Sequence, residues 1–154
     1  MILLLAALLI GIVAGLRAMV APAVVSWAAY LGYLPLAGTP LAFLGWRFTP
    51  WIFSVLALGE LITDQLPSTP SRKVPLQFVT RVIAGAFCGA AIGLTGAALW
   101  SGLVAGAIGA VLGTLGGAAA RGALAARFGS DRPAALLEDL VAIGGAIGIV
   151  ALLP

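Results

Sequence analysis

Long apolar runs, separated by short segments rich in proline, arginine or aromatic residues, fill most of this sequence. A helix needs about 20 mainly apolar residues to cross the hydrocarbon core of a bilayer. Runs near or above that length cover 2–32, 51–66, 76–99, 101–127 and 134–153. We therefore predict an all-α, polytopic membrane protein, in which a single transmembrane domain (1–154) has about five spanning helices.

The scarcity of charge supports this interpretation. Only 8% of the residues are charged and 62% are hydrophobic, with a mean hydropathy of +1.19, whereas a soluble domain has roughly 25% charged residues. So few charges could not cover a water-facing surface. The net charge of +3 is also too small and too scattered for a nucleic-acid surface. We expect membrane lipids, and no nucleic acid, as partners.

Arg17 and Pro22 interrupt the first run, which is longer than a bilayer requires. Its roughly 30 residues would extend about 45 Å as one helix. The run is compatible with one helix kinked at Pro22, or with two half-helices separated by a break near 17–22. We expect the single kinked helix. The run lacks the basic segment that precedes a signal-peptide core, so we interpret it as a retained helix.

Two carboxylates, Glu60 and Asp64, lie in the second run. They are four residues apart and share one helix face, which must meet a cation, a cavity or a substrate rather than lipid. Counting about 1.5 Å per residue puts Glu60 and Arg17 at a similar depth near mid-membrane, and we predict that they pair or share a polar pocket. The pair is either a salt bridge that fixes helix register, or a substrate- or ion-binding site in which Glu60 exchanges Arg17 for a cation or proton. The candidate site comprises Arg17, Glu60 and Asp64.

Further charges lie toward one end of the later runs, at about the depth of Asp64. They are Arg81, Arg121, Glu138 and Asp139. Charges from several helices at one depth suggest a polar network or an inner gate. Alternatively, they anchor helix ends by reaching to the membrane interface.

The turn after the second run combines hydroxyls with cations. Its candidate ligands for an anion or a lipid headgroup are Ser68, Thr69, Ser71, Arg72 and Lys73. The alternative is an ordinary loop that follows the positive-inside rule. Five spans would place this turn, the turn at 127–133 and the N-terminus on one side. That side has most of the basic residues, so we expect a cytoplasmic N-terminus and an external C-terminus.

Glycines recur every four residues in the third and fourth runs, a spacing that forms one helix stripe where backbones can approach closely. The stripes are Gly85, Gly89 and Gly93; Gly102 and Gly106; and Gly109, Gly113 and Gly117. We predict that the third and fourth helices pack together through them. Alternatively, a glycine face forms the contact of a homodimer. Packing within one chain and packing between two copies are compatible, because more than one glycine face is available.

Short internal similarities suggest a repeat. The residues around Arg17 (GLRA, 15–18) resemble AARG at 119–122, and GELI at 59–62 resembles EDLV at 138–141. The first two spans would then be an inverted repeat of the last two, an arrangement common in transporters. Such similarities also arise by chance in apolar sequence.

The sequence lacks the residues that several kinds of catalytic and metal-binding site require. The chain has no histidine, and its single cysteine, Cys88, excludes an intrachain disulfide and a multi-cysteine metal site. No familiar acyl-transfer triad and no phosphate-binding loop can be identified. We therefore expect no enzyme activity, no cofactor and no metal.

Three segments, GLRAMVAPAVVSW (15–27), GELITDQLPSTPSR (59–72) and LLED (136–139), resemble a family of small bacterial integral membrane proteins, domain of unknown function 4126. The resemblance spans nearly the whole chain and implies a membrane fold, in the bacterial inner membrane, without a substrate. It also implies a set of recurring polar positions: Arg17, Glu60, Asp64, Pro67, Ser71, Arg72, Glu138 and Asp139.

These observations favour a small transporter or channel for a small solute or ion. The alternative is a membrane protein that does not transport, either a scaffold or a lipid-headgroup binder that uses the 68–73 turn. A transporter should have a cavity that reaches Glu60. A scaffold should have Glu60 sealed against Arg17.

Overall fold

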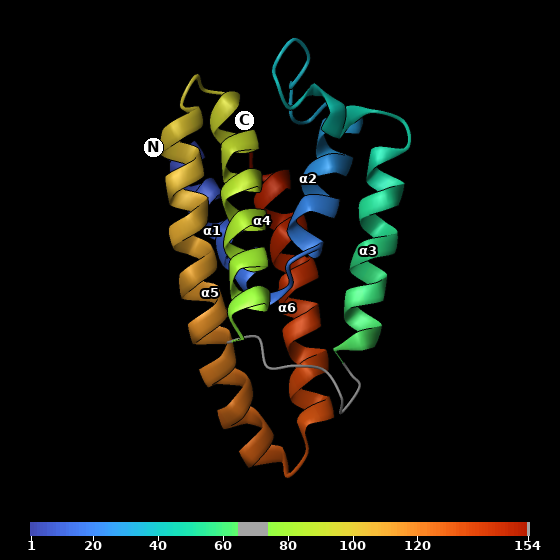
Figure 1. Ribbon diagram of the computed structural model, residues 1–154, viewed down its shortest axis with the longest axis vertical. Helices are drawn as coiled ribbons and strands as arrows, with labels where there is room; N and C mark the ends of the chain where they lie inside the picture. The colour runs from blue at the N-terminus through green and yellow to red at the C-terminus, as the bar shows by residue number, and fades with distance from the viewer. Residues whose placement is uncertain (65–73, 154) are drawn as a thin grey trace.

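The computed structural model describes residues 1–64 and 74–153, and this part of the chain is entirely helices and turns (Figure 1). The elements in chain order are α1 (Ile2–Leu16), α2 (Val20–Tyr30), the short 3₁₀ helix η1 (Ala42–Gly45), α3 (Thr49–Thr63), α4 (Pro75–Leu94), α5 (Leu99–Phe128) and α6 (Asp131–Ala151). The predicted all-α class is confirmed. Of the described helices, α4, α5 and α6 are long and apolar enough to cross a membrane, as expected for a membrane protein.

The first apolar run is two helices, so the prediction of one kinked helix is wrong. α1 ends at Leu16, Arg17 has extended backbone angles (φ −140°, ψ 109°), and α2 begins at Val20. Pro22 lies in the first turn of α2, where backbone N–H groups have no partner within the helix. The proline is therefore accommodated at the start of a helix and does not kink a continuous one.

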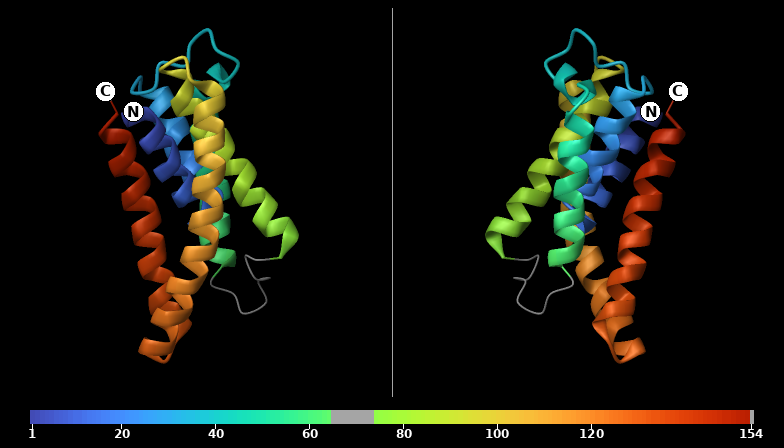
Figure 2. Two further views of the ribbon diagram at one scale, coloured as in Figure 1. Left: turned by 90° about the vertical axis from the view of Figure 1, so that its left-hand side faces the viewer. Right: turned by 90° about the vertical axis from the view of Figure 1, so that its right-hand side faces the viewer.

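α1 and α2 form a hairpin that returns to the end from which it came. Figures 1 and 2 show the N-terminus, the C-terminus and the loop after α2 at one end of the molecule, and the α5–α6 turn at the other. The expected grouping of the N-terminus with the 127–133 turn is therefore wrong. The physical reason is the break at Arg17, which lets the first run reverse direction.

Glycines bring α1, α4 and α5 into backbone contact. A Cβ added to Gly106 would lie 2.1 Å from the Gly85 carbonyl oxygen, and one added to Gly89 would lie 2.3 Å from that of Gly102. The predicted packing of the third and fourth apolar runs is thus confirmed. The α5 stripe that contains Gly109 and Gly113 packs against α1, which was not predicted. A Cβ on Gly113 would lie 2.2 Å from the Ile12 carbonyl oxygen in α1.

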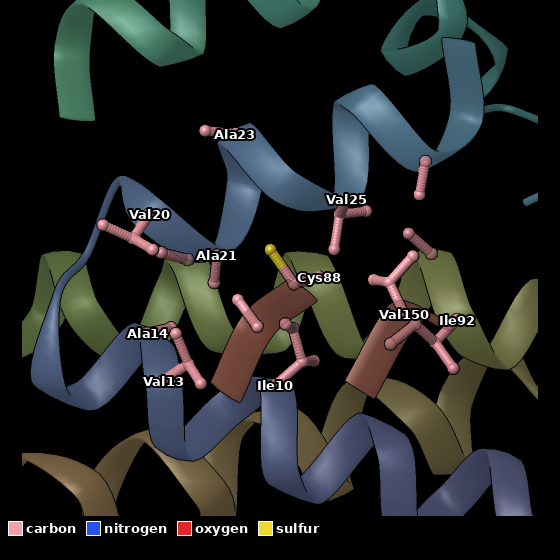
Figure 3. Packing of buried hydrophobic residues seen from close by; sticks show 14 of the residues in the cluster. Ile10, Val13, Ala14, Val20, Ala21, Ala23, Val25, Cys88, Ile92 and Val150 are labelled. Atoms are coloured by element: carbon pink, nitrogen blue, oxygen red, sulfur yellow. The ribbon is translucent and has the colours of Figure 1, made fainter. Parts of the chain in front are cut away.

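The two half-helices are part of the hydrophobic core. Figure 3 shows Ile10 and Val13 of α1, Val25 of α2 and Ile92 of α4 close together, with Val150 of α6 beside them. Small residues such as Ala14 and Ala21 let these helices approach each other. The helices α3, α4, α5 and α6 all have exposed large apolar side chains, which suits a surface in contact with lipid.

α3 is the most loosely attached helix. Among the described elements it packs mainly against α2 and η1, and only Pro50 and Ala57 of its residues are buried. α5, by contrast, is one uninterrupted helix of 30 residues. Its continuity gives no support to an inverted repeat, because the first run is broken and the run that should match it is not.

Candidate functional site

The break between α1 and α2 creates two helix ends inside the molecule. Such ends expose backbone groups without partners, and they carry a partial positive charge at the N-terminus of α2 and a partial negative charge at the C-terminus of α1. Buried groups of this kind must be satisfied by other parts of the chain. Two ionised side chains, Glu60 and Arg81, do so here.

Glu60 occupies the inner end of α2. Its two carboxylate oxygens accept hydrogen bonds from the backbone N–H groups of Ala18 and Met19, each at 2.8 Å. Glu60 lies near the end of α3, so this contact joins α3 to the helix break. The carboxylate also faces the positive end of the α2 dipole, a favourable electrostatic contact.

Arg81 occupies the inner end of α1. From α4, its Nη1 donates to the backbone carbonyl oxygens of Leu16 at 2.6 Å and Gly15 at 3.1 Å. The hydroxyl of Thr114 in α5 also donates to Gly15, at 3.3 Å. Opposite charges thus close the two inner ends, a cation at the C-terminal end and an anion at the N-terminal end.

Arg17 lies in the break itself and is completely buried. Its Nη1 pairs with Asp64 of α3, and its Nε donates to Oδ1 of Asp139 of α6 at 2.6 Å. A guanidinium buried this deeply requires such partners, because an isolated buried charge is strongly destabilising. Arg17 therefore connects the broken helix to both α3 and α6.

The charges form one connected cluster of arginines and carboxylates. Nη2 of Arg81 lies 3.6 Å from Oε1 of Glu60 and 3.8 Å from Oδ2 of Asp64. Beyond Arg17, Oε2 of Glu138 lies 3.9 Å from the Arg17 Nη2 and 3.4 Å from the Arg121 Nη1. We call this set the charge network: Glu60, Arg81, Asp64, Arg17, Asp139, Glu138, Arg121 and Asp131.

Asp131 forms the outer end of the charge network. Its carboxylate accepts hydrogen bonds from Nε and Nη2 of Arg121 at 2.9 and 2.5 Å, and 61% of its side chain is exposed. Sequence reasoning did not include it among the site residues. The signal that could have found it is the short α5–α6 turn at Gly129, since antiparallel helices bring residues on either side of such a turn together.

The charge network corrects the predicted pairing. The sequence predicted that Arg17 and Glu60 pair or share a polar pocket. They do not pair: Glu60 binds N–H groups just before α2 and lies beside Arg81, while Arg17 binds Asp64 and Asp139. The predicted central site and the predicted inner gate are therefore parts of one cluster. The proposed anion-binding residues Ser68, Thr69, Ser71, Arg72 and Lys73 lie outside the described residues, as does Pro67.

A second, aromatic contact holds the other end of α3. Nε1 of Trp27 in α2 donates to Oγ of Ser54 at 3.0 Å, and the rings of Trp27 and Trp51 meet edge to face with centroids 5.1 Å apart. α3 is thus held by an aromatic contact near its start and by carboxylates near its end.

The arrangement can hold charges of either sign but does not resemble a metal site. Within residues 1–64 and 74–153, no group of three carboxylate, cysteine or histidine side chains is placed to bind one metal ion. Comparison with known proteins finds no family model, no curated protein and no solved structure that matches this chain.

Proposed function

We propose that this protein is a small multi-pass transporter or channel of the bacterial inner membrane, for a small solute or ion. The observation that carries the proposal is the broken α1–α2 helix, whose inner ends are occupied by Glu60 and Arg81. Non-helical backbone at membrane depth is tolerated where it lines a cavity or is buried in protein, and in transporters such breaks form the binding site.

The loose attachment of α3 supports the proposal. α3 carries Glu60 and Asp64, and it packs mainly against α2 and η1. Movement of its carboxylate-bearing end would uncover the N–H groups of Ala18 and Met19 together with Arg81, and would free two carboxylates. The same motion would thus provide binding groups for a solute or ion at the break.

The orientation follows from the basic residues at the α5–α6 turn. Arg127 and Arg132 lie there, whereas Arg47 lies near the loop at the opposite end. The positive-inside rule then places the α5–α6 turn in the cytoplasm and both termini on the outer side. The family resemblance and the inverted repeat remain predictions.

A homodimer also remains a prediction. The glycine stripes expected to form it pack within one chain, through contacts such as Gly106 with Gly85 and Gly113 with Ile12. A second copy would therefore have to bind through a different surface.

The pairing of Arg17 favours a second candidate, a membrane scaffold without transport activity. Arg17 is completely buried, with Asp64 and Asp139 as partners. In a scaffold, these buried contacts would have one task, to fix the relative positions of α2, α3 and α6. The lipid-headgroup binder predicted from Ser71, Arg72 and Lys73 concerns residues outside the described part of the chain.

Flux measurements separate these two candidates. Purified protein in proteoliposomes is tested for movement of protons, Na⁺, K⁺ and Cl⁻ under an imposed potential and under a pH gradient alone. A transporter should show flux that is lost in Glu60→Gln and Asp64→Asn but retained in Arg47→Gln, a control in the loop before α3. Equal flux in the native protein and Glu60→Gln would remove the charge network from the pathway. No flux under either gradient would favour the scaffold.

A further inference from the structure

A cavity of about 150 Å³ lies beside the charge network, between α5 and α6. Leu16 of α1 closes it on the inside, and Gly117, Leu124, Leu137 and Val141 form much of its wall. It is open on one side. Because Leu137 and Val141 are also exposed, the opening lies on the outer surface of the helix pair.

The cavity is suited to hydrocarbon. Arg121 and Glu138 contribute to its wall, but their charged groups lie 3.4 Å apart and bind each other. Its surface is almost wholly apolar. An apolar cavity of this size accepts a group about as large as a benzene ring. In a membrane, the available group of that kind is a segment of a lipid acyl chain.

Two arginines lie past the part of the cavity wall that is nearest the α5–α6 turn. Arg127 continues the cavity-lining stripe of α5, three residues and about 4.5 Å past Leu124. Arg132 lies across the turn, in the first turn of α6. Both are exposed, and neither forms an ion pair with the described residues. Figures 1 and 2 show that the turn between them extends past the ends of α3 and α4.

We propose that the cavity and these arginines form a binding site for one anionic phospholipid. A segment of its acyl chain fills the cavity, and its phosphate lies against Arg127 and Arg132. The cavity shares Arg121 and Glu138 with the charge network, and its place in the anionic leaflet rests on the orientation proposed above. The argument for this occupant is charge complementarity. An apolar cavity lies next to two cations that form no ion pair within the described part of the chain, on the side that the proposed orientation makes anionic.

The selectivity should come from the headgroup. Lipid chains are as apolar as the leucines that they would contact, so chain burial alone distinguishes poorly among lipids. Each arginine near an anionic membrane surface contributes about a five-fold gain in affinity. Phosphatidylglycerol should therefore bind more tightly than phosphatidylcholine, and each arginine removed should reduce the preference about five-fold.

The test is native mass spectrometry of the detergent-solubilised full chain with phosphatidylglycerol, phosphatidylcholine or glycerol phosphate. The native protein should retain phosphatidylglycerol in preference to the other two. Arg127→Gln should weaken that retention about five-fold, and Ala120→Phe, which fills the cavity, should weaken retention of both phospholipids. Arg47→Gln is the matched control and should change nothing. Circular dichroism and thermal unfolding verify that each variant is folded.

Three results would overturn the proposal. Equal retention of phosphatidylglycerol and phosphatidylcholine would remove the role of the arginines. Glycerol phosphate bound as tightly as phosphatidylglycerol would show a phosphate site without a chain site. A dimer that persists without lipid and is disrupted by Ala120→Phe would identify a second copy of the chain as the occupant of the cavity.

Discussion

The carboxylate of Glu60 accepts a hydrogen bond at 2.8 Å from the backbone N–H of Met19, which is 41 residues earlier in the chain. This contact exists only because the first apolar run is broken, since a continuous helix would use that N–H within itself. It links the two features that define the molecule, a helix break and a carboxylate in an apolar helix. Each stabilises the other, because the carboxylate accepts the hydrogen bonds of the exposed N–H groups and those groups give a buried carboxylate its partners.

Glu60→Gln should destabilise the folded protein. Glutamine removes the charge and replaces one accepting oxygen with an NH₂ group, which leaves one of the two N–H groups, of Ala18 or Met19, without an acceptor. The expected loss is about 1–3 kcal/mol in the free energy of unfolding. It can be measured by thermal unfolding in a fixed detergent. Thr80→Val is the control, because within the described residues the half-buried Thr80 hydroxyl bonds to its own helix, at Leu76. Equal stability of the two variants would contradict the capping role of Glu60.

The sequence predicted most helices well and their connection poorly. The four later apolar runs correspond to α3–α6 with boundaries shifted by a few residues, because apolar length and flanking prolines determine where such helices can form. The reversal at Arg17 was not predicted. A kinked helix and a hairpin of two half-helices have the same apolar pattern, and only the packing of α2 against its neighbours distinguishes them.

The sequence also predicted which charges would gather but not which would pair. Counting residues gives the depth of a side chain along the membrane normal. It placed Arg17 and Glu60 near mid-membrane, and it placed Asp139, with the other charges, nearer one end. It does not give the direction in which a helix face points. Glu60 binds backbone groups, and no residue pattern indicates an acceptor for N–H groups that a predicted continuous helix would have satisfied.

Gly106→Ala should be more damaging than an alanine at an open position of α5. A Cβ on Gly106 would lie 2.1 Å from the Gly85 carbonyl oxygen and 3.0 Å from the Gly89 Cα, and both are backbone atoms that cannot turn aside. We expect a loss of about 2 kcal/mol or more in stability. Gly116→Ala is the matched control, because nothing lies within 4 Å of a Cβ there. The control should be neutral or stabilise by up to about 1 kcal/mol. Denaturant titration in micelles measures both, and similar losses would refute the close contact of α4 with α5.

A double-mutant cycle should show strong coupling between Arg17 and Asp139. Nε of Arg17 donates to Oδ1 of Asp139 at 2.6 Å, and Arg17 is fully buried, so either single change leaves a charge without its partner. We expect a coupling free energy of about 1 kcal/mol or more for Arg17→Met with Asp139→Leu. A control cycle that combines Arg17→Met with Thr80→Val should give a coupling free energy near zero. Coupling to Glu60 that exceeds the coupling to Asp139 would restore the pairing predicted from the sequence.

Both termini should lie on the same side of the membrane, opposite the α5–α6 turn. Figure 2 shows the two termini together at one end of the molecule. In a Cys88→Ala background, Ala37→Cys reports the loop after α2 and Ser130→Cys reports the α5–α6 turn, and both positions are exposed. A membrane-impermeant maleimide applied to intact spheroplasts should label Ala37→Cys at once and Ser130→Cys only after permeabilisation. Epitope tags at the two termini should be accessible together, before permeabilisation.

The native Cys88 provides the internal control for that labelling. It is completely buried in the core, so the unmodified protein should not react under either condition. Tags accessible on opposite sides would mean that the first run crosses the membrane once. The chain would then have an odd number of crossings, and the break at Arg17 would be a kink in a continuous span. In that arrangement the N–H groups of Ala18 and Met19 would be used within the helix, and Glu60 would be free to pair with Arg17.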